Sequence, residues 1–235
     1  MKQHRLIRFC CVALLLICGT ARGQILRDHW SHEVTFGGGY CLNEHFSIEF
    51  SYFYFPWRYL GVGGYVGMHA SGRDRQIPFG PVSSTPDYSS WILTSEHAKV
   101  TGLTLTPSLL LTTPAVRVNA LAISLRVIPG VTLGLPRERI EVEYREVDAD
   151  KLVEYSNYKY ERYWLKGNQW LSWSGKVALN LSIDELGFGL GYGVSNYDIW
   201  NTRRSGNIEG TSFQSFYPTP QAIYQYFFLY ASWKF

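Results

Sequence analysis

The chain has 235 residues, of which 16% are aromatic and 17% are charged, and its formal net charge is +3. This length allows one large domain with a sizeable core. The positive charge gives no support to nucleic-acid binding, because residues 1–23 hold four cations and no acid; without these four cations the formal net charge is −1.

The first 23 residues predict a secretory signal peptide, and residues 24–235 then form the mature domain. The peptide begins with the cations Lys2, Arg5 and Arg8. An apolar stretch follows, Phe9–Cys18, which is too short to cross a bilayer as a helix. The small residues Ala21 and Gly23 mark the expected cleavage site.

Cleavage after Gly23 changes the cysteine count. Three of the four cysteines lie in the signal peptide, and Cys41 is the one that remains. We therefore expect an exported domain without an internal disulfide. A domain of this kind must be held together by its own core or by a membrane.

The mature sequence alternates bulky apolar residues with small or polar ones, in segments of roughly ten residues. This pattern predicts β-strands, and the apolar set of each strand is expected to face lipid. Outside the signal peptide we find no apolar run clean enough for a spanning helix, because proline and arginine interrupt the most apolar region, Leu103–Leu135. We expect eight strands, at residues 32–42, 45–55, 58–70, 98–111, 117–133, 170–183, 186–196 and 223–235.

The connections between these strands differ in length. Residues 71–97, 134–169 and 197–222 are long, whereas residues 112–116 and 182–185 are short. Short inner turns and long outer loops are typical of transmembrane barrels. Asn43-Glu44 is expected as a tight outer turn and 55–57 as the first inner turn. The predicted fold is all-β, an eight-stranded antiparallel transmembrane up-and-down β-barrel.

A soluble β-sandwich or a lipocalin-like barrel is the alternative, since both use alternating strands. Their exposed faces are rich in Lys, Glu and Thr. Here the second face is Gly, Ser, Thr and a few charged residues, which favours a narrow polar lumen. Open sheet edges are not tolerated in lipid, so the sheet is expected to close.

The last strand adds a further prediction about the lumen. Tyr226, Phe228 and Tyr230 have the inward register, and the neighbouring strands carry glycines at inward positions: Gly37, Gly39, Gly187, Gly189, Gly191 and Gly193. We expect the three rings to lie over bare glycine backbone. The alternative is that the glycines permit sharp curvature of the sheet.

The signal peptide, the alternating segments and the final YASWKF resemble small Gram-negative outer-membrane β-barrel proteins. In that family a last strand that ends in an aromatic residue is what the barrel assembly machinery recognises. The resemblance implies export through a cleaved signal peptide, location in the cell outer membrane, and contact with outer-membrane lipid and the assembly machinery. It implies no particular activity, because one fold hosts many roles.

We assign no catalytic, cofactor-binding or metal-binding residue from the sequence. The mature histidines are His29, His32, His45, His69 and His97. His29 and His32 have no cysteine nearby to complete a zinc site. His69 and His97 flank the first long loop and could be neighbours, with Ser71 or Ser95 nearby, and some eight-stranded outer-membrane barrels are lipid-A-modifying enzymes that use His and Ser near the outer rim. We expect that this chain is not an enzyme.

Three charged residues fall on inward positions: Glu49, Arg126 and Lys176. Buried charges need partners, and eight strands leave room only for side chains. We expect one salt-bridge network that fills the lumen. The alternative is a gated ion path through a small channel.

The best functional lead is the loop at residues 134–169. Its charged residues alternate with apolar and aromatic ones, including Ile140, Val142 and Tyr144. This pattern predicts that strands five and six continue beyond the membrane as a β-ribbon, which either binds an extracellular partner or shields the barrel rim. We expect a structural or surface-binding, adhesion-type role; a lipid-A-modifying enzyme and a small channel are the alternatives.

Overall fold

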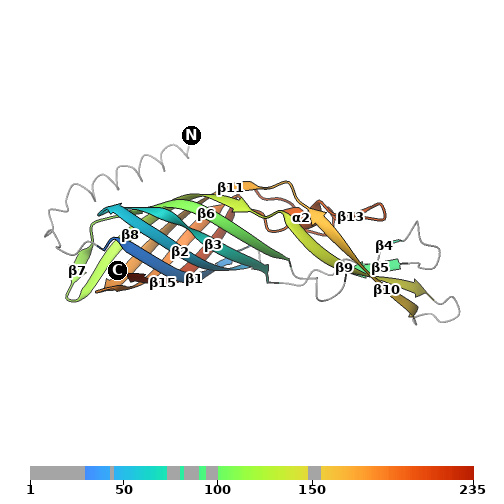
Figure 1. The fold of residues 1–235 in the computed structure, drawn as a ribbon, viewed down its shortest axis with the longest axis horizontal. Coiled ribbons are helices and arrows are strands. Elements are labelled where there is room, and N and C mark those ends of the chain that lie inside the picture. Colours follow the sequence, from blue (N-terminus) through green and yellow to red (C-terminus); the bar gives the residue numbers. More distant parts are fainter. Residues whose placement is uncertain (1–29, 43–44, 73–79, 82–89, 94–99, 148–154) are drawn as a thin grey trace.

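Eight antiparallel strands form a closed sheet in the computed structural model, which describes residues 30–42, 45–72, 80–81, 90–93, 100–147 and 155–235 (Figure 1). The predicted signal peptide lies outside these described residues. The eight strands are β1 (His32–Cys41), β2 (His45–Trp57), β3 (Leu60–Ser71), β6 (Thr101–Thr112), β8 (Leu121–Gly134), β11 (Leu171–Ile183), β12 (Leu186–Ser195) and β15 (Tyr224–Lys234).

Each of these strands pairs with the next one along the chain, and β15 pairs back onto β1. The sheet therefore has no open edge, and the predicted eight-stranded antiparallel barrel is confirmed. Among the described residues, no helix is long and apolar enough to cross a membrane.

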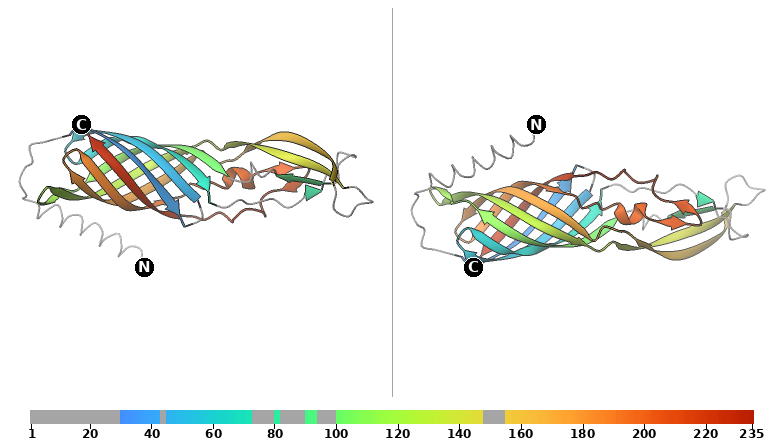
Figure 2. Two further views of the ribbon diagram at one scale, coloured as in Figure 1. Left: turned by 90° about the horizontal axis from the view of Figure 1, so that it is seen from below. Right: turned by 90° about the horizontal axis from the view of Figure 1, so that it is seen from above.

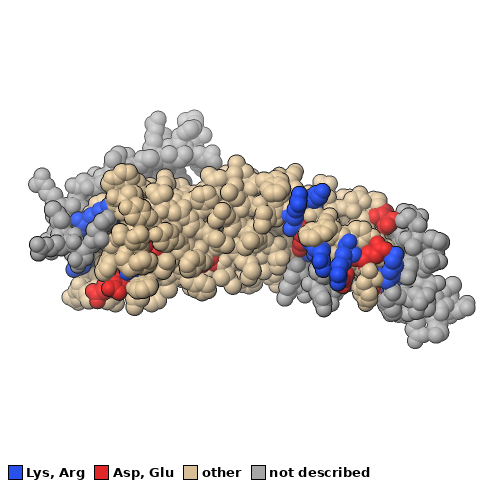
Figure 3. Space-filling model, in the orientation of Figure 1, with Lys and Arg blue, Asp and Glu red and all other residues tan. Residues whose placement is uncertain are grey.

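The side chains of the barrel alternate between the outside and the lumen, as the sequence pattern predicts. In β12, Leu186, Phe188 and Leu190 are about 60% exposed, and the glycines between them face inward. In β15, Phe227, Leu229 and Trp233 are exposed. The result is a continuous outer surface of large apolar side chains, and Figure 3 shows a middle section of the molecule with few charged residues.

The short turns differ from the expected ones in two places. The residues after β6 form a small extra strand, β7 (Val116–Val118), which pairs with the start of β8. The turn lies at Asn119, which has a left-handed φ of 57°, a conformation that Asn adopts readily. The expected strand 117–133 is therefore two strands.

The expected turn at 55–57 is also wrong, because β2 continues to Trp57 and its pairing with β3 is irregular between Tyr54 and Trp57.

The three rings of β15 lie over glycines of β12, which confirms the predicted packing. Residue by residue, Tyr226 is paired with Gly193, Phe228 with Gly191 and Tyr230 with Gly189. A Cβ atom added at any of the three glycines would collide with the ring of its partner. On the other side, β15 pairs with β1, where Gly37 and Gly39 lie opposite Tyr230 and Phe228.

The charged residues of the lumen form two ion pairs instead of the expected single network. Arg126 donates two hydrogen bonds, of 2.5 and 2.8 Å, to the carboxylate of Glu33. Lys176 pairs with Glu49, and its Nζ also lies 3.6 Å from the centre of the Tyr65 ring. The sequence prediction is wrong here because it grouped the inward charges without including Glu33.

The three long connections fold together beyond one end of the barrel, and we call this unit the cap (Figures 1 and 2). The first connection contributes β4 (Gly80–Pro81) and β5 (Ser90–Leu93), and the second contributes β9 (Arg137–Val147) and β10 (Tyr155–Lys166). These four strands form one sheet in the order β10-β9-β5-β4. The third connection contributes α2 (Asn201–Arg204), β13 (Asn207–Ile208) and β14 (Thr211–Ser212).

The cap has a hydrophobic core of its own. Its buried residues come from all three connections: Trp91, Val100, Ile140, Val142, Tyr144, Leu165, Ile199, Trp200, Ile208, Phe213 and Tyr217. The predicted ribbon is thus confirmed as the β9–β10 hairpin, but one of its faces is covered by the other two connections. Figure 3 shows charged residues on the outer surface of the cap, and a second group at the opposite end of the barrel.

Candidate functional site: a cleft at the outer rim

The described histidines lie at opposite ends of the barrel. His32 is at the end with the short turns, where its ring stacks on Phe235 with centroids 5.4 Å apart. His45 and His69 are at the cap end inside the lumen, with ring centroids 5.8 Å apart. His29 and His97 lie outside the described residues, so the position of His97 relative to His69, across the first long loop, is not described. No group of three or more His, Cys, Asp or Glu in the described part of the chain is arranged to hold a metal ion.

The lumen is filled by its own side chains. Tyr65 and Ser174 form a hydrogen bond of 2.9 Å across it, and Thr106 donates one of 3.1 Å to Thr132. Two small cavities lie in the described part of the lumen, each of about 30 Å³, which is room for one or a few water molecules. Neither of these two cavities can hold a larger ligand.

Tyr197 lies where the lumen meets the cap. Its ring stacks at a tilt on His69, with centroids 5.1 Å apart, and its side chain occupies the space beside Gly102 and Gly134. Burial raises the pKa of Tyr197 to about 12, and the negative charge of Glu138 contributes to the same shift. Tyr197 is therefore neutral at physiological pH and separates the lumen from the cap.

A cleft of about 790 Å³ lies outside the lumen, between the barrel rim and the cap. One wall is the segment that leads from β10 into β11, with Asn168, Gln169 and Trp170. The other walls come from the third connection: the residues after β12, the helix α2, and the arm that returns to β15. The volume is within the range of sites for small ligands, about 300–1,000 Å³.

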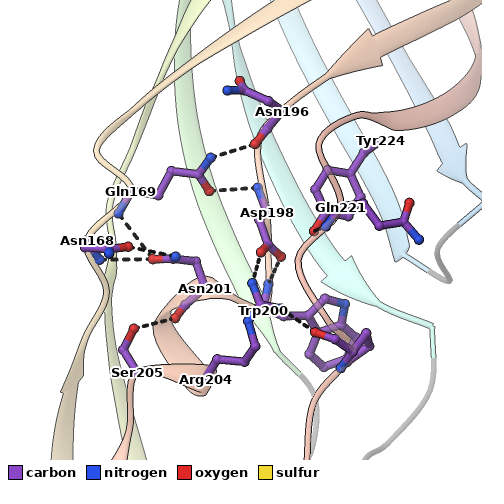
Figure 4. Close-up of polar contacts among 11 residues, drawn as sticks. Asn168, Gln169, Asn196, Asp198, Trp200, Asn201, Arg204, Ser205, Gln221 and Tyr224 are labelled. Carbon is purple, nitrogen blue, oxygen red and sulfur yellow. Dashed lines mark hydrogen bonds and ion pairs between the residues drawn. The ribbon is translucent and has the colours of Figure 1, made fainter. Parts of the chain in front are cut away.

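Hydrogen bonds fix the two walls to each other (Figure 4). The side-chain oxygen of Asn201 accepts hydrogen bonds from the backbone N–H groups of Asn168 and Gln169, at 3.0 and 3.2 Å. Its Nδ2 donates to Oδ1 of Asn168 at 2.8 Å. The cleft thus has a defined shape without a ligand.

Gln169 forms a second set of hydrogen bonds between the two walls of the cleft. Its Nε2 donates to the backbone oxygen of Asn196 at 2.6 Å, and its Oε1 accepts from the backbone N–H of Asp198 at 2.9 Å. Oδ1 of Asn196 in turn accepts from the backbone N–H of Trp173 in β11, at 2.7 Å. The cap segment is in this way anchored to the first residues of the barrel strand.

The charged groups beside the cleft are paired. Arg204 forms an ion pair with Asp198 and donates a hydrogen bond of 2.6 Å to the backbone oxygen of Pro218. Burial lowers the pKa of Arg204, which stays charged beside the carboxylate. Below the cleft, burial disfavours the charge of Arg203, but two hydrogen bonds of 2.6 Å to Glu138 outweigh this and raise its pKa. Both pairs hold the cap together and add no net charge to the cleft.

These features define a class of protein. A closed eight-stranded barrel with an apolar outer surface, a filled polar lumen, short turns at one end and long connections at the other is the architecture of the small outer-membrane β-barrels. Searches with protein-family models and among curated protein sequences find no match to this chain.

Solved structures of this class are similar to the chain over most of its length. The N-terminal β-barrel domain of Pseudomonas aeruginosa OprF is 9% identical, with 87% of this chain and 96% of that chain covered and a TM-score of 0.36. Neisserial surface protein A (NspA) is 7% identical, with 87% and 94% covered and a TM-score of 0.38. The attachment invasion locus protein Ail of Yersinia pestis is 8% identical, with 87% and 97% covered and a TM-score of 0.34. At these values the class is defined by the closed sheet and its apolar surface.

Sequence reasoning found only part of the cleft. Asn168 and Gln169 lie at the end of the loop 134–169, which was the best functional lead. Asp198 and Asn201 lie in the third connection, which the sequence identified only by its length, and Asn196 was expected as the last residue of a strand that ends at Ser195. The signal that could have found them is the density of Asn, Asp and aromatic residues between residues 196 and 201, at the end of a predicted strand.

Proposed function

We propose that this protein is an integral outer-membrane barrel that holds a folded binding module, the cap, at the cell surface. The observation that carries this proposal is the core of the cap, to which all three long connections contribute buried aromatic residues such as Trp91, Tyr144 and Trp200. Loops that only shield a barrel rim need no shared core. A shared core fixes the shape of the outer surface, and fixed shape is what specific binding requires.

The cellular location follows from the same proposal. The signal peptide delivers the chain to the periplasm, and the assembly machinery inserts it through β15, whose exposed side chains Phe227, Leu229 and Trp233 then contact lipid. The cap faces outward, since long connections lie on the extracellular side of such barrels. An extracellular partner binds at the cap, whose second connection spans residues 134–169.

We propose further that the barrel is neither an enzyme nor a channel. The position of His45 and His69 supports the first point, because both are turned into the lumen, where a lipid substrate has no access. The small lumen cavities and the two ion pairs support the second point. Lipid A from cells with and without the protein should have the same mass spectrum, and the purified protein should add no conductance to a planar bilayer.

The proposal is tested on whole cells. The mature protein should fractionate with the outer membrane and migrate faster on a gel when it is not boiled. An epitope inserted between Gly210 and Thr211, a turn that Glu209 and Gly210 make with positive φ, should be labelled by antibody on intact cells. Recovery in the soluble periplasm, or labelling only after the cells are broken, would contradict the proposal.

A further inference from the structure

The cleft at the outer rim lies close to the lipid surface. Leu171, which lines it, is also the first residue of β11 and is paired with Leu133 of β8 in the barrel wall. Both leucines and the adjoining Trp170 are exposed. Tryptophan is enriched where lipid meets water, because its ring is apolar and its N–H is polar. The cleft therefore opens at the height of the lipid headgroups.

Charge excludes several classes of ligand. The charged side chains that line the cleft are Asp198 and Arg204, and they pair with each other. A phosphate or sulfate group would need a cation that is not already paired. An acyl chain would need apolar walls, whereas more than half of the residues that line this cleft are polar. A neutral, hydroxyl-rich ligand fits the remaining chemistry.

The cleft is lined by an unusual number of carboxamides: Asn168, Gln169, Asn196, Asn201, Gln214 and Gln221. Each carboxamide both donates and accepts hydrogen bonds, as does each hydroxyl of a sugar. Asn201 and Gln169 are used to hold the walls together. The side chains of Gln214 and Gln221 are exposed, and in the described part of the chain no hydrogen bond involves either side-chain amide.

The carboxamides of the cleft thus form two sets, one that holds the walls together and one that is exposed, and a carbohydrate site needs both. The fixed carboxamides give the cleft its shape, so little ordering of the protein opposes binding. The exposed carboxamides of Gln214 and Gln221 are available for hydroxyl groups. The exposed ring of Trp170 offers a flat apolar surface, against which the C–H face of a pyranose can lie.

We infer that this cleft binds a short neutral oligosaccharide, held by the carboxamides of Gln214 and Gln221 and by the ring of Trp170. The inference deepens the proposed function, since it gives the chemical class of a ligand for the surface module. Sugars of this class occur in two places: in the outer leaflet of the bacterium's own membrane, and on the surface of another cell. The height of the cleft allows both.

Binding is measured with the full mature chain refolded in detergent micelles. One probe is the neutral fraction of the oligosaccharides freed from the lipopolysaccharide of the same cells by mild acid hydrolysis and dephosphorylation. The other is an array of neutral and sulfated oligosaccharides of animal-cell type. We expect a neutral oligosaccharide from one of the two sources to bind. Binding to the first probe assigns the ligand to the protein's own membrane, and binding to the array assigns it to another cell.

Matched variants show whether the cleft is the site. Trp170→Ala and Gln221→Ala should each weaken binding by about tenfold or more, the loss expected for an aromatic or hydrogen-bonded contact at the centre of a site. Trp164→Ala and Gln225→Ala are the controls, because Trp164 and Gln225 are exposed residues that do not line the cleft. All four variants should retain the faster migration of the unboiled barrel, which shows that they are folded.

Three results would overturn the inference: no binding to any neutral oligosaccharide, binding confined to sulfated ones, or equal losses in the cleft variants and the controls. None of them affects the proposed function if the protein still fractionates with the outer membrane and shows its cap on intact cells. If the protein does not fractionate with the outer membrane, the proposed function is wrong. The affinity of the purified protein for sugars is a separate measurement, so the two failures can be told apart.

Discussion

Because the charged residues Glu33, Arg126, Glu49 and Lys176 are paired inside the lumen, the loss of any one of them should lower the stability of the barrel. Glu33 and Arg126 are both almost fully buried and form a bidentate pair. Removing one partner leaves an uncompensated charge, which costs about 3–5 kcal/mol of the free energy of unfolding. We expect this loss for Glu33→Ala and for Arg126→Ala, measured by reversible urea unfolding in lipid vesicles.

The double variants distinguish two pairs from one network. Glu33→Ala combined with Arg126→Ala should lose much less than the sum of the single losses, because the second change removes the charge that the first left unpaired. Glu33→Ala combined with Lys176→Ala should be close to additive. Strong non-additivity in this second combination would show that the charges act as the single network that the sequence predicted.

Tyr197 gives a prediction about pH. Its pKa is raised to about 12 from an ordinary value of 10.0, chiefly by burial. The folded state therefore holds this proton more tightly than the unfolded state. The stability that it contributes is present in full below pH 10 and is lost as the pH rises from 10 to 12. The difference in tyrosinate absorbance between the wild type and Tyr197→Phe should have its midpoint near pH 12, and a midpoint near pH 10 would show that Tyr197 is exposed to water.

At this scale the sequence predicts which side chains face inward but not which of them meet. Strand alternation alone turns Glu49, Arg126 and Lys176 into the lumen. The pairing depends on the stagger between strands that are far apart around the barrel, such as β1 and β8, and no local pattern encodes that stagger. Glu33 has the same inward register in β1, so alternation also turns it into the lumen, but its pairing with Arg126 does not follow from that pattern.

In the contact between β12 and β15, aromatic rings of β15 pack over glycines of β12. Gly189→Leu should block folding because the ring of Tyr230 fills the space of the new side chain, and Gly193→Leu should do so because of Tyr226. Each defect should be partly rescued by trimming its own ring: Tyr230→Ala for Gly189→Leu, and Tyr226→Ala for Gly193→Leu. Folding is scored by the faster migration of the unboiled barrel.

The two variants are also controls for each other. Tyr226→Ala should not rescue Gly189→Leu, and Tyr230→Ala should not rescue Gly193→Leu, because each ring covers one of the two glycines. Gly191 is a poorer choice for this test, since a Cβ there would also meet the backbone oxygen of Val177. If no trimming of β15 rescues either variant, the glycines serve the curvature of the sheet.

The cap should unfold without the barrel when its core is damaged. Trp200 and Phe213 are fully buried in that core and contribute through the third connection. Truncation of such a residue to Ala costs about 3–5 kcal/mol. Trp200→Ala or Phe213→Ala should make the cap sensitive to trypsin while the barrel remains resistant. Trp164→Ala, on the exposed side of β10, should leave the cap as resistant as the wild type.

For the cap, the sequence predicted one hairpin but not the core that the three connections share. Charged and apolar residues alternate in the loop 134–169, and this local pattern predicted the β9–β10 hairpin. The shared core joins residues from three connections that are separated by tens of positions, such as Trp91, Ile140 and Phe213. Only the folded barrel brings the ends of these connections together, so their association could not be seen in any one segment.

At the scale of the whole molecule, the surface of the barrel wall differs from the surface of the cap. The barrel wall exposes large apolar side chains, and Figure 3 shows charged residues on the cap and at the opposite end of the barrel, with few between them. A water-soluble protein rarely leaves so large an apolar surface uncovered. The closed sheet and the alternation of every strand could be predicted from the sequence, because both follow from a period of two residues and the cost of an open edge in lipid.

The position of the apolar surface in lipid is the central claim, and spin labels test it most directly. In a Cys41→Ala background, single cysteines at Leu190 in β12, Leu229 in β15 and Arg162 on the outside of the cap are labelled in vesicles. At Leu190 and Leu229, collisions with oxygen, which dissolves in lipid, should exceed those with a water-soluble nickel chelate; at Arg162 the order should be reversed. Nickel collisions as frequent at Leu190 and Leu229 as at Arg162 would show that the barrel surface faces water, and would contradict the account.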